Sequence, residues 1–457
     1  MEIGDKITRY TPDIIEDIRR LVSIRSVQAE AKENMPFGLE CAKALNLALK
    51  MGQDFGFRTK NLDNYCGYIE MGEGEDLIGM LCHVDVVAEG ENWTYAPYGG
   101  ELDNGVLYGR GVSDDKGPFV IALYAMKIIE ELAIPLGKRV RLVIGANEES
   151  GSLCMKHYKK HEEAFTLGFS PDADFPLIFG EKGIFHAQLR GKLKFDNLTV
   201  LGLVGGEAMN VVAPKCTCVF KSKKKYDGVQ DEVINYCNKN NLQYELSQEA
   251  EEVSLSIVGV SAHASTPEFG VNAISHMMAL LGKIDNSSTF VRGFNSIFGV
   301  EYTGQMAGIM SRDEYGELTL NIGLVSLEGE SATMSLDIRY PITQTFDANL
   351  KMLSSKLGEY GISITDEVDT KPLFVDPNSY LVQTLYSAYK SVTKDEINKP
   401  FCIGGGTYAK EFENVVAFGT AFPGENTRIH MSDEFLTVDA LQKSLAIYVE
   451  ALSNLLK

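Results

Sequence analysis

Leu81-Cys82-His83-Val84-Asp85 is the stretch around which the chain is organised. Upstream, residues 76–81 form an apolar run typical of a strand entering a core, and two polar side chains then interrupt it. Side chains alternate between the faces of a strand, so a strand over residues 76–87 places His83 and Asp85 on the same side. That arrangement suits an imidazole whose ring N–H is held by a carboxylate while its other nitrogen binds a metal. A buried histidine paired with a structural aspartate is the alternative reading of these residues.

Composition and charge exclude several classes of protein. The chain has 457 residues, 44% hydrophobic and 23% charged, which is typical of a soluble globular protein with enough length for about three domain-sized units. Its 43 basic and 63 acidic side chains give a net charge of −20, so we expect neither nucleic acid nor a membrane surface as a partner. No apolar run approaches the roughly 18 residues of a membrane span, and no secretion signal opens the sequence. Eight scattered cysteines without a Cys-x-x-Cys motif fit a reducing cytoplasm.

Predicted strands and helices alternate through the first part of the chain. Helices are expected over residues 11–24, 37–55 and 119–132, and strands over 65–70, 139–145 and 164–169. Acidic pairs lie where these elements begin or end, at Asp114-Asp115 and Glu148-Glu149, and Asp172 follows the strand over 164–169. Helix capping could explain the aspartates, and solvated loop charge the glutamates. In α/β folds, however, functional sites gather at the C-terminal ends of parallel strands.

The character of the sequence changes near residue 185. Alternating strands mixed with helices, typical of an α+β domain, continue to about residue 374, and the first style then resumes. The predicted organisation is therefore a catalytic α/β domain formed by residues 1–185 and 375–457, interrupted by residues 186–374. On the helix expected after Glu149, His157 and His161 are spaced for metal binding, but two lysines lie between them, and we interpret them as a solvated helix face.

Five motifs occur in the order of one known family. They are His83-Val-Asp-Val-Val, Asp114-Asp-Lys-Gly-Pro, Glu148-Glu-Ser-Gly, Ser170-Pro-Asp-Ala-Asp-Phe-Pro and Gly404-Gly-Gly-Thr-Tyr-Ala, followed by a late His430. Together they resemble the two-zinc peptidases grouped with aminoacylase, glutamate carboxypeptidase and carnosinase, and in detail the bacterial PepV-type dipeptidases. The resemblance covers nearly the whole chain and departs from the family pattern at Ala88, where a proline is expected. It implies a catalytic domain with a central mixed sheet and helices on both faces, interrupted by a large α+β lid.

The resemblance also implies a role for each polar residue of the catalytic domain. Asp114 bridges two metal ions, His83 and Asp172 complete one protein shell, and Glu149 and His430 complete the other. Two Zn²⁺ ions per chain are expected, with Mn²⁺ or Co²⁺ possible because ligand type selects weakly among these metals. Glu148 is expected to act as the general base, and Asp85 to orient His83.

Further residues resemble the family's substrate contacts. His263 matches a lid histidine that donates to the carbonyl oxygen as it becomes an oxyanion, although a histidine bonded only to backbone is the alternative. Asn210 and Arg339 match lid residues that contact substrate, and Arg339 could instead be a partner of Asp337. The expected substrate-binding residues of the catalytic domain are Gly404, Gly405, Gly406 and Thr407.

The expected activity is hydrolysis of dipeptides or other short peptides by a metal-activated water. A deacylase acting on N-acyl amino acids would need the same metals, and a non-enzymatic binding module is opposed by the presence of Glu148 beside the full ligand set. The insertion is close to twice the length of a lid of about 100 residues in dimeric relatives, so we expect a doubled lid and an active monomer.

Overall fold

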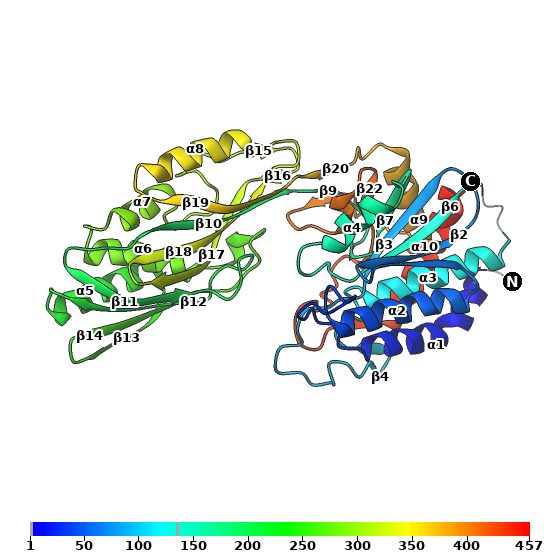
Figure 1. Ribbon diagram of the computed structural model, residues 1–457, viewed down its shortest axis with the longest axis horizontal. Coiled ribbons are helices and arrows are strands. Elements are labelled where there is room, and N and C mark those ends of the chain that lie inside the picture. Colours follow the sequence, from blue (N-terminus) through cyan, green and yellow to red (C-terminus); the bar gives the residue numbers. More distant parts are fainter. Residues whose placement is uncertain (1–2, 134–136) are drawn as a thin grey trace. The chain divides into compact units, whose positions relative to one another are not determined.

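The computed structural model describes residues 3–133 and 137–457 (Figure 1). Contacts divide the chain into two compact units. One unit runs to Gly180 and resumes at Phe374, and we call it the terminal unit; the other is Glu181–Leu373, the inserted unit. The boundaries predicted from the sequence, after residues 185 and 374, lie within a few residues of these.

The terminal unit is built on a nine-stranded sheet with the order β1-β2-β6-β3-β7-β22-β9-β20, and β21 pairs with β9. β3 is parallel to both β6 and β7, and β7 is parallel to β22, whereas β1 and β2 and then β2 and β6 are antiparallel. The sheet is therefore mixed, as predicted. Its strands are β1 (Arg58–Leu62), β2 (Cys66–Met71), β3 (Leu77–His83), β6 (Arg139–Gly145), β7 (Leu167–Ser170), β9 (Ile178–Glu181), β20 (Leu373–Phe374), β21 (Phe401–Ile403) and β22 (Val415–Ala417).

Helices cover both faces of this sheet, and neighbouring residues of β2 show why. Gly52 of α2 (Leu39–Asp54) approaches Ile69 so closely that a Cβ atom at residue 52 would clash with it. The next residue, Glu70, points to the other face, where its partner Arg141 also donates to the hydroxyl of Tyr158 on α4 (Leu153–His161). Alternation along one strand thus separates an apolar face under α2 from a polar face under α4.

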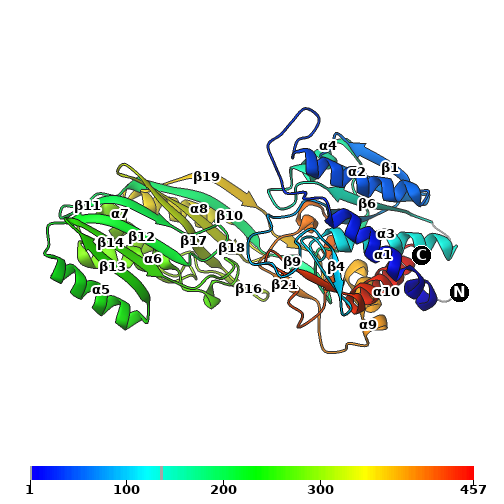
Figure 2. The ribbon, with the colours of Figure 1, turned by 90° about the horizontal axis from the view of Figure 1, so that it is seen from below.

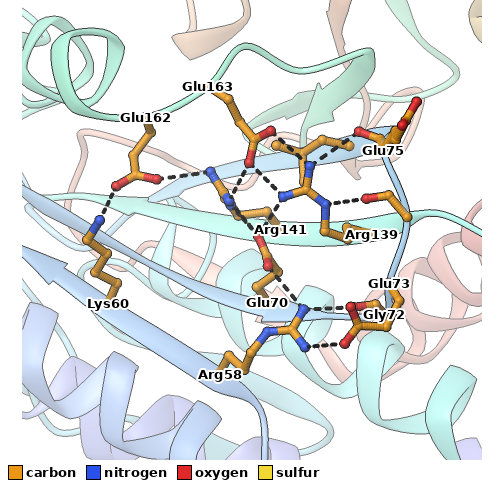
Figure 3. A network of polar contacts seen from close by, with 12 residues as sticks. Arg58, Lys60, Glu70, Gly72, Glu73, Glu75, Arg139, Arg141, Glu162 and Glu163 are labelled. Atoms are coloured by element: carbon orange, nitrogen blue, oxygen red, sulfur yellow. Dashed lines mark hydrogen bonds and ion pairs between the residues drawn. The ribbon is translucent and has the colours of Figure 1, made fainter.

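The polar face carries a network of ion pairs, drawn in Figure 3. Arg141 is 2% exposed, and its guanidinium lies 2.6 Å from Oε2 of Glu70. Arg58 and Arg139 extend the network toward solvent through Glu70, Glu73 and Glu163. A guanidinium keeps its charge when it is buried, and the surrounding carboxylates offset the cost of removing that charge from water.

The remaining helices of the terminal unit include one that starts earlier than expected. α1 begins at Ile3 rather than at Thr11 and continues through Pro12 to Val22, although proline removes one backbone hydrogen bond. Ile7 and Tyr10 are buried, so packing extends the helix past the local signal. No described helix combines the length and the apolar character that crossing a membrane requires. The other helices are α3 (Lys116–Glu131), α9 (Tyr380–Thr393), α10 (Val438–Leu455) and the 3-10 helix η2 (Tyr408–Glu411).

Small sheets complete the terminal unit and hold loops near the ends of the large one. β8 (Ala173–Asp174) pairs with β23 (Thr420–Ala421), and β5 (Val106–Tyr108) pairs with both β4 (Glu101–Asp103) and β24 (Phe435–Thr437). The part of the chain before the inserted unit is therefore tied to the part after it at two points.

The inserted unit has one eight-stranded antiparallel sheet with the order β13-β14-β12-β11-β17-β18-β10-β19. Figure 1 shows its helices on the same side of this sheet, and Figure 2 gives a second view. Phe185, Ala187 and Leu189 alternate along β10 and join the core beneath the helices. The elements are β10 (Gly183–Lys192), β11 (Leu198–Gly205), β12 (Lys215–Ser222), α5 (Tyr226–Asn240), β13 (Gln243–Glu249), β14 (Glu252–Val258), η1 (Pro267–Phe269), α6 (Ala273–Ile284), α7 (Thr289–Ile297), β15 (Arg312–Asp313), β16 (Gly316–Glu317), β17 (Thr319–Glu328), β18 (Ser331–Tyr340), α8 (Asp347–Gly358) and β19 (Ser363–Thr370).

The inserted unit repeats one topology. β11, β12, α5 and β13 form a hairpin, a helix and a returning strand, and β17, β18, α8 and β19 follow the same order. In the sheet, β14 lies between β12 and β13, just as β10 lies between β18 and β19. The two halves meet where β11 pairs antiparallel with β17, at Val204 with Ser326 and Gly205 with Val325. The unit thus contains two four-stranded halves within one sheet.

Seven cysteines are buried as free thiols in the two units. The terminal unit holds four of them and the inserted unit three: Cys41, Cys66, Cys82 and Cys154, then Cys216, Cys218 and Cys237. They fill the core as small apolar side chains.

Candidate metal centre

The site begins at the C-terminal end of β3. His83, its last residue, is fully buried, and Asp85 follows in irregular backbone rather than in the longer strand that the sequence predicted. Nδ1 of His83 lies 3.0 Å from the main-chain oxygen of Asp85 and 3.6 Å from its carboxylate. The carbonyl of Asp85 is therefore the nearer partner of the imidazole, and the carboxylate, which was expected to hold it, lies at the longer distance. With its proton on Nδ1, the ring presents a lone pair at Nε2.

The carboxylate of Asp85 has another contact. It accepts hydrogen bonds from the backbone N–H of Glu148, at 3.0 Å, and of Glu149, at 3.1 Å. These two glutamates follow β6, the parallel neighbour of β3, so Asp85 fixes one strand end against the next. The side chain that was expected to orient His83 thus also orients the acidic pair.

Two groups of ligand atoms share one aspartate. Oδ1 of Asp114 lies 2.9 Å from Nε2 of His83, and Oδ2 lies 3.0 Å from Nε2 of His430. Asp172 completes the first group, 3.5 Å from His83, and Glu149 completes the second, 3.2 Å from His430. The sequence-predicted ligands therefore come together as two sets of three, each compact enough to hold one metal ion.

The donor atoms fit divalent metal ions. Ligands at about 2.0–2.2 Å from a tetrahedral zinc are about 3.4 Å apart, close to the separations found between these side chains. Nε2 of His83 is buried and makes no hydrogen bond with a described residue, although Asp114 lies beside it. A buried nitrogen lone pair that accepts no hydrogen bond is free to bind a metal ion.

The charges of the site fit a cation as well. Burial raises the pKa of Glu149 and of Asp172, and in each case the Asp114 carboxylate raises it further. Hydrogen bonds to Asp114 and Glu149 raise the pKa of His430 to about 11, because a proton on this ring places a positive charge beside these two carboxylates. Clustered carboxylates at a strand edge are stabilised when a metal ion supplies the missing positive charge.

Glu148 lies beside the ligands without belonging to either set. Burial raises its pKa well above the usual range, and the carboxylates of Asp172, Glu149 and Asp114 add to the shift. It lines the same pocket as the ligands Asp114 and His430. A half-buried glutamate with a raised pKa is typical of a general acid–base group.

A pocket with an empty volume of about 830 Å³ opens beside these residues. Gly405, Gly406 and Thr407, three of the four glycine-loop residues predicted to bind substrate, line it, and Gly404 does not. The Thr407 hydroxyl accepts the N–H of Ala409 and so caps η2. Sequence reasoning missed further lining residues, among them Ser113, Asp174, Ile178, Ile403, Thr420, Ala421, Thr427 and Ile429. Asp174 could have been found, because it lies within one of the quoted motifs.

A buried ion pair that sequence reasoning also missed holds two of the ligand loops. The carboxylate of Glu434, 0% exposed, accepts the N–H of Gly111, Ser113 and Asp114 at 2.9–3.2 Å. It also accepts Nη1 of Arg110 at 2.7 Å, and this guanidinium donates to the carbonyl of Met431. Since residues 430–434 carry both His430 and Glu434, the pair fixes the Asp114 loop against the His430 loop.

The remaining predicted residues belong to the inserted unit. Val211, next to Asn210, forms a bridge with His263, and the N–H of Ala264 donates to the carbonyl of Asn210, so the structure brings these two predicted residues together. His263 is exposed, with Nδ1 2.6 Å from Oγ of Ser265. Arg339 pairs in register with Thr319, whose hydroxyl donates to the carbonyl of Ala264.

Arg339 has a close acidic partner within its own strand. Its Nε and Nη2 donate to the two carboxylate oxygens of Asp337 at 2.7 and 2.8 Å, and Asp337 also contacts His186. The structure therefore contains the pairing with Asp337 that the sequence raised as an alternative, and substrate binding by Arg339 stays a prediction. A bidentate pair of this kind holds the guanidinium in one orientation.

Comparison with known proteins identifies the family of the chain. Residues 79–454 match the profile of the peptidase family M20/M25/M40. The chain is 36% identical over 470 residues to a Bacillus subtilis (strain 168) protein named "Putative dipeptidase YtjP", with 99% of each chain covered. A Staphylococcus aureus (strain USA300) protein with the same kind of name is 33% identical, with 99% of this chain and 98% of that protein covered.

Solved structures extend the likeness to the fold. Human carnosine dipeptidase 1 matches with a TM-score of 0.60 at 13% identity, covering 99% of this chain and 98% of that one. The di-peptidase Dug1p from Saccharomyces cerevisiae matches with a TM-score of 0.59 at 14% identity and the same coverage. The match of the family profile over most of the sequence, together with these full-length relatives, shows that the chain belongs to peptidase family M20/M25/M40.

Proposed function

We propose that this peptidase is a dipeptidase of the PepV type that uses two metal ions, with zinc as the first candidate and manganese or cobalt as alternatives. The observation that carries the proposal is the position of Asp114, whose two carboxylate oxygens lie 2.9 and 3.0 Å from two different histidines. A single metal ion would not need both sets of three ligands. The names of the full-length relatives support the dipeptidase assignment.

The chain's own residues would hold the metals in two groups. His83 and Asp172 would bind one ion, Glu149 and His430 the other, and Asp114 both. When bound, two such ions polarise a carbonyl oxygen and lower the pKa of water. Three protein ligands per ion leave room for substrate, as catalytic sites require.

Glu148 would move the protons of the reaction. As a carboxylate it would take a proton from the attacking water, and as a carboxylic acid it would pass that proton to the amine that leaves. Its raised pKa supports both halves of this exchange, because the group can hold the proton between the two steps.

Residues of the inserted unit would recognise the substrate and stabilise the charge that develops. His263 would donate to the carbonyl oxygen as it becomes an oxyanion, and Asn210 would contact the substrate beside it. Arg339 would bind the terminal carboxylate of a peptide, with its orientation set by Asp337. In the terminal unit, Gly404 to Gly406 would add backbone N–H groups, and Thr407 would contact the substrate.

A substrate panel tests the proposal against a deacylase that acts on N-acyl amino acids. Free dipeptides and their N-acetylated forms would be compared by kcat/KM on the metal-loaded chain. We expect the free dipeptides to be preferred, because Asp174 lines the pocket as an exposed carboxylate that suits an ammonium group. Preference for the acetylated forms would replace the dipeptidase assignment with a deacylase.

We also propose that the protein works as a monomer in the cytoplasm. The seven buried free thiols support a reducing compartment. The repeated topology of the inserted unit supports a chain that needs no second copy.

A further inference from the structure

A second group of metal-ligand side chains lies on the surface of the terminal unit. Its members are Asp63, in the turn between β1 and β2, and His157 and His161, one turn apart on α4. One ligand atom from each lies within 4.8 Å of the other two, and none of the three residues lines the pocket described above. The i, i+4 spacing places both imidazoles on the same side of the helix, with ring centroids 4.2 Å apart.

The side chains are held in orientations that suit a metal ion. Nδ1 of His161 lies 2.9 Å from the carbonyl oxygen of His157, and a proton donated there leaves the lone pair at Nε2. The His157 ring stacks on Tyr65 at 4.3 Å with an interplanar angle of 10°. Nε2 of His157 lies 3.0 Å from Oδ2 of Asp63, the separation of two ligands that share one ion.

The turn that carries Asp63 is also well defined. Asp63 and Asn64 both have positive φ, at 53° and 58°, as in the tight turns that join antiparallel strands. The side chain of Lys159, which lies between the two histidines in sequence, donates to the carbonyl of Glu411 at 2.9 Å. Its ammonium group is therefore bound elsewhere, although the sequence suggested that the lysines would make this helix face an ordinary solvated one.

We propose that Asp63, His157 and His161 form a third metal site, separate from the paired ions of the pocket, for a divalent transition metal such as Zn²⁺, Co²⁺ or Ni²⁺. Two imidazoles and one carboxylate suit these metals, whereas Mg²⁺ and Ca²⁺ prefer oxygen ligands alone. Water would complete the coordination, since all three residues reach the surface and Asp63 and His161 are exposed.

The zinc content of the chain tests the proposed third site without depending on enzyme activity. The full chain would be stripped with a chelator, reloaded with Zn²⁺, passed through a desalting column and analysed for zinc and protein. We expect His161→Gln to contain one zinc ion per chain fewer than the native protein. This difference of one holds whatever the pocket takes up, so failure of the proposed peptidase chemistry and failure of the third site give different results.

A control variant distinguishes a specific metal site from nonspecific binding of zinc to a surface histidine. His186 lies 3.0 Å from Asp337, the same distance as His157 from Asp63, but Asp337 is shared with Arg339 and not with a second imidazole. His186→Gln should therefore keep the native zinc content. Equal contents in the native protein and in His161→Gln would overturn the proposal, as would an equal loss in both variants.

Thermal unfolding gives a second measurement. A bound ion stabilises the folded chain by mass action, so adding Zn²⁺ beyond the amount that fills the pocket should raise the Tm of the native protein. In His161→Gln this further rise should be absent, while the Tm without metal should stay close to the native value because residue 161 is exposed. The same further rise in both proteins would contradict the assignment.

Discussion

Glu148 and Glu149 are neighbours in sequence with different surroundings. Glu149 lies 3.2 Å from His430 and belongs to a ligand set, whereas Glu148 belongs to neither set and has a strongly raised pKa. Asp85 holds the backbone N–H of both residues. One short turn thus presents two carboxylates to one pocket, and we expect substitutions of the two to have different effects.

Glu148→Gln should retain the metal ions and lose turnover. The amide has nearly the same shape but cannot accept a proton, and acid–base help of this kind contributes about 10²–10⁴-fold to the rate. Steady-state kcat and elemental analysis on the same preparation would check both halves of the prediction. Near-native kcat with full metal content would show that another group moves the proton.

Asp114→Ala should empty both metal positions, because this carboxylate is the one ligand common to the two sets. Asp172→Ala is the matched control, since it removes a ligand from the set of His83 alone. Metal content after reconstitution should fall furthest in Asp114→Ala and only by about one ion in Asp172→Ala. Equal losses in the two variants would argue against a shared bridging residue.

Among the structural elements, the loops that follow the central strands carry the ligands, and the buried Arg110–Glu434 pair joins two of those loops. Ser113 adds a hydrogen bond from its hydroxyl to the carbonyl of Phe435, at the start of β24. Because β24 pairs with β5, the His430 loop is anchored to the segment that leads into Asp114. Residues that are not themselves predicted metal ligands therefore help to set the distance between Asp114 and His430.

Glu434→Gln should weaken metal binding without removing a ligand. Outer residues that orient ligands typically contribute about 10–100-fold to metal affinity, and we expect a loss in this range by calorimetric titration. Glu70→Gln is the control, because Glu70 is also a buried partner of an arginine but belongs to the network of Figure 3. Both variants should unfold at lower temperature, since breaking a buried ion pair is destabilising. Equal metal affinities in the two would contradict a positioning role for Glu434.

The elements that the sequence predicted well are those with a local cause. The C-terminal ends of parallel strands lie at the same edge of a sheet. The sequence could therefore predict that polar side chains at the ends of β3, β6 and β7 lie close together, and His83, Glu149 and Asp172 all lie close to Asp114. Contacts between distant segments could not be predicted in the same way. The bond of Glu434 to the Asp114 loop spans more than 300 residues, and the early start of α1 depends on packing rather than on a local signal.

At the scale of the whole molecule, the inserted unit repeats a hairpin, a helix and a returning strand on each side of the β11–β17 pair. In dimeric relatives with a single lid of about 100 residues, the family resemblance implies that a second subunit supplies the lid histidine. We propose that a unit with two similar halves supplies that histidine within one chain. Under this proposal, assembly and catalysis are linked through the inserted unit.

Mixing two inactive variants tests this link. Glu148→Gln and His263→Ala each remove one group that the proposed reaction needs, and they lie in different units. We expect no recovery of activity in the mixture and a mass in solution of a single chain. Recovered activity would show that one chain lends His263 to another, and the protein would then be an obligate dimer.

Chemical modification of the seven buried thiols can show when the core of each unit opens. Burial raises the pKa of Cys41, Cys154 and Cys218 to about 12, so at neutral pH these groups hold almost no reactive thiolate. Alkylation by iodoacetamide should therefore reach them only when the surrounding core opens, whereas the less buried Cys402 should be modified first. Because four of the seven lie in the terminal unit and three in the inserted unit, peptide mapping of the alkylated sites over time should show which unit opens first under denaturant. Simultaneous modification of all seven would mean instead that the two units unfold as a single cooperative body.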